Sequence, residues 1–165
     1  MLSDIPNNTV CFVDANIFYY CLVNTPDLTP DCVGFMKRVE KGELNAMTSS
    51  VAIAEAIHKV MLTEAVQKHS LSRQGLVHRL QRQSHLIATL SEHKKVTELV
   101  RALKLHVEPI TLDLLERAAG CSIQYRLLTN DALTVAVMEK LRLMDIATND
   151  EDFDSVANLK VWKPK

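Results

Sequence analysis

The chain has 165 residues, and at roughly 150 residues per domain this length predicts a single domain spanning 1–165. Hydrophobic residues make up 47% of the chain and charged residues 24%, proportions that exclude a disordered or collagen-like protein. The 19 lysines and arginines are balanced by 20 acidic residues, so the overall charge does not by itself indicate a polycationic nucleic-acid binder.

The cysteines and the N-terminus bear on the cellular compartment. The four cysteines, at positions 11, 21, 32 and 121, form neither a CxxC pair nor a zinc-finger spacing, so we expect reduced thiols in the core. The N-terminus lacks the basic and apolar regions of a signal peptide. The longest apolar stretch, VCFVDANIFYYCLV, is interrupted by polar residues and is too short to span a bilayer. These features predict a cytoplasmic protein without membrane segments.

Short apolar runs predict five β-strands, at 9–14, 44–48, 106–110, 144–148 and 159–162. Helical patterns lie between them, at 15–24, 29–41, around 53–61, at about 75–105, from 111 to near Gly120, and at about 129–141. The expected helix N-caps are Thr29, Ser49 or Ser50, Thr111, and Thr129 or Asn130. Strands that alternate with helices predict an α/β fold with a parallel sheet.

Acidic residues stand at equivalent places in these predicted elements, just after strands or in the first turns of helices. They are Asp14, Glu55, Asp131, Asp150 and Asp152. Because strand carboxyl ends and the following helix N-termini share one edge of a parallel sheet, we expect these acids to converge on one crevice. Helix capping would explain Asp131, but it does not explain Asp14 or Glu55, which lie within apolar segments.

Carboxylates that converge repel one another, and a hard divalent cation removes this penalty. Ligands that are all oxygen atoms suit Mg²⁺ or Mn²⁺ better than Zn²⁺. Such ions polarise a phosphodiester and activate a water molecule. No Ser–His–Asp or Cys–His arrangement is recognisable, and the GxGxxG and GxxxxGK motifs are absent. Glu55 and His58 form a Glu-x-x-His motif like that of di-iron bundles, but the second copy that such a centre needs is missing.

Charge is distributed unevenly along the chain. Residues 67–106 contain eight Lys or Arg against two Glu, whereas residues 145–154 contain five acids and no base. Two solvated faces would give this pattern, and so would a polyanionic substrate bound beside a metal site. For an RNA substrate, the candidate contacts are Arg73, Arg79 and Arg82.

Four segments resemble the acidic motifs of PIN-domain ribonucleases. They are FVDANIFYY at 12–20, SSVAIAEAIHK at 49–59, LLTNDALTVAVM at 127–138 and IATNDEDFDSV at 146–156. The resemblance implies a Rossmann-like α/β PIN domain whose parallel sheet has the order 3-2-1-4-5, with the basic helical stretch 67–106 as an insertion. It also implies a Mg²⁺- or Mn²⁺-dependent endoribonuclease in which water attacks phosphorus.

The resemblance assigns roles to individual residues. The catalytic and metal-binding acids fall on Asp14, Glu55, Asp131 and Asp150, with Asp152 as an auxiliary metal-binding acid. Asn16 and Thr148 match polar positions that orient these acids.

Many PIN proteins of this size are VapC-like toxins, which dimerise and are held inactive by an antitoxin. The resemblance therefore implies a homodimer and an antitoxin partner, although the long span between Glu55 and Asp131 departs from the compact toxin pattern. Hydrophobic residues that the core leaves free are expected to contribute to the dimer face. The candidates are Phe18, Tyr19, Tyr20, Leu22, Phe35 and Met36.

Three alternatives stay open at the level of the sequence. A haloacid-dehalogenase-like phosphatase also has an Asp after its first strand, but it needs a second Asp where this chain has Asn16. A response-regulator receiver lacks a matching phospho-accepting Asp. A non-catalytic RNA- or protein-binding module would keep the acids for structural reasons, and a test for stabilisation by Mn²⁺ distinguishes it from the enzyme.

Overall fold

The computed structural model describes the whole chain, residues 1–165, and is built around a five-stranded parallel sheet. The strands are Val10–Val13 (β1), Asn45–Ser49 (β2), His106–Glu108 (β3), Asp145–Ala147 (β4) and Lys160–Trp162 (β5). Their order is β3-β2-β1-β4-β5, and every neighbouring pair is parallel. The predicted fold class and the sheet order 3-2-1-4-5 are therefore confirmed.

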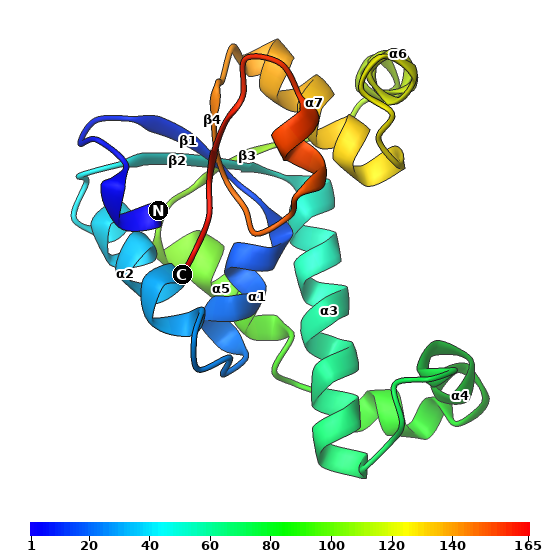
Figure 1. Cartoon of the computed structure of the whole chain (residues 1–165). Coiled ribbons are helices and arrows are strands. Elements are labelled where there is room, and N and C mark those ends of the chain that lie inside the picture. The colour runs from blue at the N-terminus through cyan, green and yellow to red at the C-terminus, as the bar shows by residue number, and fades with distance from the viewer.

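Seven α-helices and three short 3₁₀ turns connect the strands. The helices are Ala15–Leu22 (α1), Thr29–Glu40 (α2), Ser50–His69 (α3), Leu76–Arg82 (α4), Lys94–Ala102 (α5), Leu112–Tyr125 (α6) and Thr129–Leu141 (α7). The 3₁₀ turns are Leu2–Asp4 (η1), Ser84–Thr89 (η2) and Asp152–Ser155 (η3). Helices α1, α2 and α5 lie on one side of the sheet, and α6 and α7 lie on the other (Figure 1).

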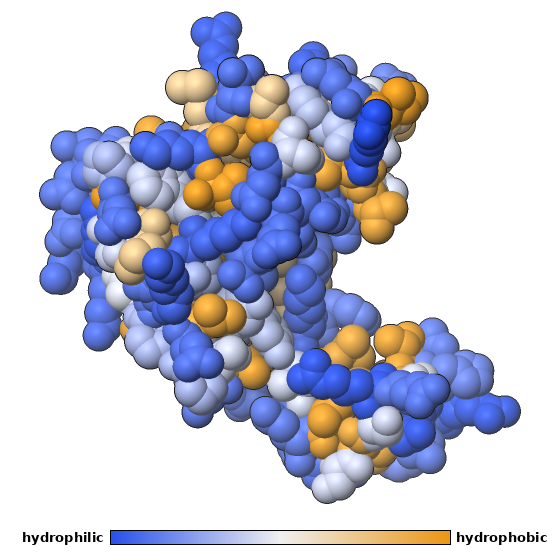
Figure 2. Space-filling view, viewed as in Figure 1, coloured by the Kyte–Doolittle hydropathy of each residue, from blue (hydrophilic) through white to orange (hydrophobic).

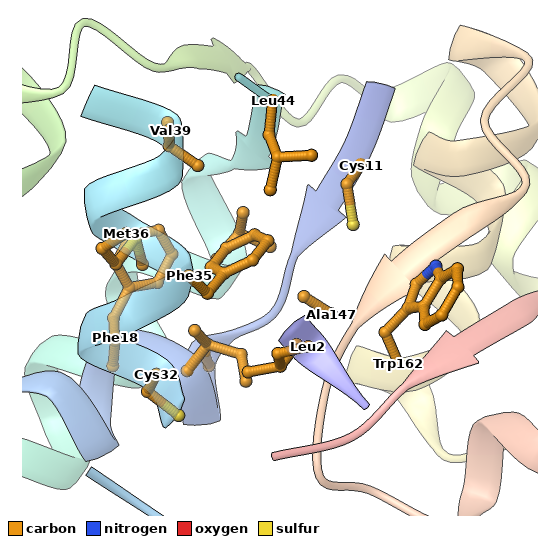
Figure 3. Packing of buried hydrophobic residues seen from close by; sticks show 14 of the residues in the cluster. Leu2, Cys11, Phe18, Cys32, Phe35, Met36, Val39, Leu44, Ala147 and Trp162 are labelled. Carbon is orange, nitrogen blue, oxygen red and sulfur yellow. The ribbon is translucent and has the colours of Figure 1, made fainter. Parts of the chain in front are cut away.

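Side chains of the central strand β1 alternate between the two faces of the sheet, as the period of two along a strand requires. Cys11 and Val13 belong to the core against α1 and α2, whereas Phe12 belongs to the core against α6 and α7. Figure 3 shows the first of these cores, where Phe35 of α2 lies near Leu44. Burial of such a side chain contributes about 1.5–3 kcal/mol, so both layers fix the position of β1 and of the residue that follows it.

Two of the predicted helix N-caps are confirmed and two are wrong. The side chains of Ser49 and Thr111 accept hydrogen bonds from backbone N–H groups in the first turns of α3 and α6. Leu28 and Leu128 occupy the N-cap positions of α2 and α7, with no side-chain bond. Thr29 is instead the first residue of α2, and its hydroxyl donates to the carbonyl of Tyr20, which ties α2 to α1.

Helix α6 does not end at Gly120, where the sequence predicts its end, but continues to Tyr125. One glycine inside a helix costs only about 1 kcal/mol of stability relative to alanine. Burial of the apolar side chains of this helix stabilises it by more than that. Leu114, Ala118 and Cys121 form its buried stripe, which extends past the glycine. The helix ends at Arg126, which adopts a left-handed conformation with φ 59°.

The predicted basic helix at 75–105 is divided into α4, η2 and α5. Leu76, Leu80 and Leu90 form a small separate core with Ala65 of α3, and this core holds residues 70–90 as an arm at the end of α3. The arm projects from the rest of the molecule (Figures 1 and 2). By contrast, Val96 and Val100 of α5 belong to the main core, so α5 is not part of the arm.

A buried carboxylate fixes the point where the arm returns to the body. Glu64 is 8% exposed, and its carboxylate accepts hydrogen bonds from the backbone N–H groups of Ser91 and Glu92. Charge-assisted bonds of this kind are stronger than those between neutral groups. They hold the chain just before α5 against α3.

Several smaller expectations are also decided by the structure. All four cysteines are free, and Cys11, Cys32 and Cys121 are buried, as expected. No helix combines the length and the apolar character that crossing a membrane requires.

Among the candidates for a dimer face, Phe18, Phe35 and Met36 lie in the core. Tyr19, Tyr20 and Leu22 are only partly buried.

Candidate active site

Asp14 lies directly after β1 and begins α1. Its Oδ1 accepts a hydrogen bond of 2.7 Å from the backbone N–H of Ala15. Its Oδ2 accepts bonds of 2.6 Å from the Asn16 amide and 2.7 Å from the Thr148 hydroxyl. Asp14 is thus the N-cap of α1, and the expectation that capping does not explain it was wrong. The cap fixes the carboxylate at the carboxyl edge of the sheet.

Asn16 and Thr148 join the start of α1 to the segment after β4. Thr148 is fully buried, and its hydroxyl accepts bonds from the Asn16 amide, 2.9 Å away, and from the backbone N–H of Asp150, 3.0 Å away. Oδ1 of the Asn16 side chain accepts a bond from the backbone N–H of Asn149. The side chains of this pair therefore position both Asp14 and the backbone that leads to Asp150.

Glu55 on α3 is held by two residues whose roles the sequence did not reveal. Its Oε2 accepts a hydrogen bond of 3.2 Å from the Asn130 side chain at the start of α7. Its Oε1 forms an ion pair of 2.7 Å with Lys59, one turn further along α3. The spacing of four residues was a usable signal for Lys59. Nothing in the sequence distinguishes the side-chain role of Asn130 from the capping role expected there.

Asp131 lies in the first turn of α7, as predicted. Burial, together with the negative charges of Asp150, Asp14, Asp152 and Glu55, in decreasing order of effect, raises its pKa to about 6. Burial also raises the pKa of Asp14, against the opposing effect of the Thr148 and Ala15 hydrogen bonds. The charges of the other four predicted acids therefore act on the carboxylate of Asp131.

Asp150 and Asp152 follow β4 in a tight turn. The backbone N–H of Asp152 donates to Oδ1 of Asp150 over 3.0 Å, and Asp152 then begins η3. Asp150 is half-buried, whereas Asp152 is exposed. Asp152 consequently lies at the solvent-facing rim of the group of acids.

Replacing Asp131 with Asn is expected to stabilise the metal-free protein. Because the folded state raises this pKa from 3.8 to about 6, the folded protein binds protons more tightly, and stability falls as the pH rises between those two values. Asp131→Asn removes this loss and should raise the free energy of unfolding by about 1 kcal/mol at neutral pH, after allowance for solvent screening. Urea unfolding measured across the pH range tests this. A gain that persists below pH 3.8 would contradict it.

The chemistry of the donor set fits a hard divalent cation, since every candidate ligand is a carboxylate oxygen. No three His, Cys, Asp or Glu side chains are arranged closely enough to hold an ion as they stand. Burial and the charges of the other four acids raise the pKa of Asp131, so these carboxylates repel one another. A cation would remove that repulsion.

A cavity of about 690 Å³ opens beside these acids, between α1, α3 and the arm. Asn16 and Lys59 line its end near the acids, Tyr19 and Tyr20 line one wall, and Arg73 lies on the arm side. Arg79 and Arg82 are not in the lining. Arg79 is half-buried and Arg82 is exposed on α4. Of the three predicted RNA contacts, only Arg73 therefore faces the cavity.

Comparison with protein families identifies the fold family of the chain. A model of the PIN domain matches residues 11–159, a range that includes the acids of all four motifs. The chain belongs to the PIN-domain family. Membership of the PIN-domain family excludes the haloacid-dehalogenase-like phosphatase and the response-regulator receiver as alternatives. In this PIN domain, Asn16 stands where a phosphatase of the haloacid-dehalogenase type would need an acid, and its amide donates to Asp14.

Solved structures share the fold of this PIN domain at low sequence identity. The structure of VapBC2 from Rickettsia felis, bound to a DNA fragment from its promoter, matches with 12% identity and a TM-score of 0.59, covering 95% of this chain and 100% of that chain. VapC20 from Mycobacterium tuberculosis, a sarcin–ricin loop cleaving toxin, matches with 17% identity and a TM-score of 0.58, covering 90% of this chain and 95% of that chain.

A toxin–antitoxin complex from Klebsiella pneumoniae also matches, with 16% identity, a TM-score of 0.51, and coverage of 91% of this chain and 95% of that chain. No curated protein sequence matches the PIN domain described here at a significant level. At these identities the solved structures establish the fold alone.

Proposed function

We propose that this PIN domain is an endoribonuclease that depends on Mg²⁺ or Mn²⁺. Asp14, Glu55, Asp131 and Asp150 hold the cation, and Asp152 assists from the rim. The observation that carries the proposal is the setting of Asp131. Burial and the charges of four other acids, from three other segments of the chain, raise the pKa of its carboxyl group, an arrangement that costs stability and that a bound cation would relieve.

Each side chain of the site has a defined task in this proposal. Asn16 and Thr148 hold Asp14 in one orientation through hydrogen bonds, and Asn130 does the same for Glu55. A bound divalent cation supplies polarisation of the phosphodiester and a lowered pKa for the attacking water. Preorganised ligands matter because a misplaced group loses transition-state stabilisation.

The substrate class follows from charge and from the structural relatives. The basic side chains of the arm and the cavity beside the acids suit a polyanion. VapC20, one of the matching structures, is a toxin that cleaves the sarcin–ricin loop, which supports RNA as the substrate here. Cleavage of total bacterial ribosomal and transfer RNA, with Mn²⁺ and with EDTA, tests the proposal. Equal cleavage in both conditions would contradict it.

The contribution of the arm to RNA binding is testable separately from catalysis. Neutralising Arg73, Arg79 and Arg82 together should weaken RNA binding and reduce the log–log salt slope by up to about 2, because each phosphate contact on a single strand contributes about 0.7. Filter binding at several salt concentrations measures the slope. Cleavage at saturating RNA should change little. An unchanged slope would show that the arm does not contact the substrate.

We also propose that the protein is the toxin of a toxin–antitoxin pair and acts as a homodimer. Two of the matching solved structures are VapBC2 from Rickettsia felis and a toxin–antitoxin complex from Klebsiella pneumoniae. These support an antitoxin partner for this chain. Light scattering of the purified protein tests the dimer. Growth arrest on expression, relieved by co-expression of a protein from a neighbouring gene, tests the toxin assignment.

A further inference from the structure

Lys59 lies on the boundary between the acids and the cavity. Its Nζ is 2.7 Å from Oε1 of Glu55, and its side chain is 43% exposed. The same side chain lines the cavity together with Asn16 and Tyr20. The Lys59 side chain therefore contacts one of the carboxylates and also lines the neighbouring cavity. It lies on α3, the helix that runs from the sheet edge to the arm (Figure 1).

A second lysine–glutamate pair in the chain shows what an ordinary surface pair looks like. Lys95 and Glu92 are 2.6 Å apart at the start of α5, with side chains 52% and 47% exposed. Lys95 lines no part of the cavity. Pairs of this kind contribute little to stability. Lys59 has similar geometry but a different setting, since its partner is one of the five converging acids.

The charge balance of the site gives Lys59 a task. Five carboxylates face an RNA phosphodiester that carries a further negative charge, and one divalent cation offsets only two of these charges. Lys59 is the basic side chain that pairs directly with one of the acids. Without a further positive charge at the cavity mouth, an approaching phosphodiester would meet net repulsion.

We propose that Lys59 is a catalytic residue that contacts the RNA phosphodiester. In the metal-free protein its ammonium neutralises Glu55. When a divalent cation neutralises Glu55 instead, the ammonium binds the phosphodiester at the mouth of the cavity. The inference rests on the proposed ribonuclease function and adds a substrate contact to it.

The chemistry of lysine suits both the contact with a carboxylate and the contact with a phosphodiester. Its ammonium is a compact charge on a flexible stem with three donors, so a rotation of the side chain is enough to move it from a carboxylate to a neighbouring phosphate. A fixed positive charge at a phosphodiester stabilises the charge that develops in the transition state. Beyond Lys59, the cavity offers Tyr20, Arg73 and His78 to the flanking nucleotide.

The experiment compares Lys59→Met, Lys59→Arg and the matched control Lys95→Met in the full-length protein. Calorimetric titration with Mn²⁺ and no RNA should show that Lys59→Met binds the ion about 2–5-fold more tightly, because an internal competitor is gone. Single-turnover cleavage of total bacterial RNA at saturating Mn²⁺ should be about 10²-fold slower in Lys59→Met. Lys59→Arg should recover part of this rate, and Lys95→Met should behave like the wild type in both assays.

Tighter Mn²⁺ binding together with slower cleavage supports the proposal, since a structural role moves both in the same direction. If Lys59→Met behaves like Lys95→Met in both assays, the proposal is wrong, and Lys59 and Glu55 form an ordinary ion pair on a helix. If the wild type cleaves no RNA in Mn²⁺, the proposed function fails and the catalytic role of Lys59 fails with it. A wild type that cleaves RNA while Lys59→Met keeps the full rate overturns the role of Lys59 alone.

Discussion

Asp14→Asn is expected to reduce the rate of RNA cleavage by at least about 10²–10³-fold while leaving the fold intact. The substituted amide has nearly the same shape, and its Oδ1 still accepts the bond from the Ala15 N–H that caps α1. It loses the second carboxylate oxygen, which in the wild type accepts bonds from both Asn16 and Thr148. Single-turnover cleavage at saturating RNA isolates this loss from any change in RNA binding.

The matched control is Asp113→Asn on α6. Asp113 is an exposed acid in the first turn of its helix, paired with Arg117, so its replacement tests the loss of one carboxylate near a helix start away from the site. Asp113→Asn should cleave at the wild-type rate. Circular dichroism of both variants should match that of the wild type. Cleavage by Asp14→Asn at the wild-type rate would contradict the proposed site.

Mn²⁺ is expected to stabilise the wild-type protein strongly. A ligand that binds only the folded state at one hundred times its Kd adds about 2.7 kcal/mol, which corresponds to a rise in Tm of roughly 5–10 °C for a chain of this length. The relief of repulsion around Asp131 adds to the driving force for binding. Differential scanning fluorimetry against Mn²⁺ concentration measures the shift.

The shift should be lost in Asp14→Asn and in Asp131→Asn, because each removes a ligand from the same site. Asp113→Asn should keep it. If no shift appears in the wild type at millimolar Mn²⁺, the acids serve a structural purpose, and a non-catalytic binding module becomes the better description of the protein.

The fold was predictable because its signals are local. Each strand is a short apolar run, and the alternation of strands with helices implies a parallel sheet. Asp14 stood out because a charged residue interrupts an apolar segment at a strand end. The edge rule for parallel sheets then places it with Asp131 and Asp150, and the charges that act on Asp131 agree with that placement.

The remaining details depend on tertiary contacts that leave no local trace. The hydrogen bond from Asn130 to Glu55 joins residues 75 positions apart. The division of the basic stretch follows from burial, since Leu90 packs with Leu76 and Leu80 while Val96 belongs to the main core. Thr29 looked like a cap because threonine before proline often is one. Its hydroxyl instead bonds to the Tyr20 carbonyl.

The most direct test of the proposed activity is the chemistry of the cut. Total bacterial RNA would be cleaved in Mn²⁺ and in water enriched in heavy oxygen, by wild-type protein and by Asp14→Asn purified in parallel, and the new ends analysed by mass spectrometry. Attack by water on phosphorus predicts linear phosphate ends that carry one heavy oxygen in the wild type, and no such ends in Asp14→Asn. Cyclic phosphate ends, or equal product from both proteins, would contradict a metal-dependent ribonuclease centred on Asp14.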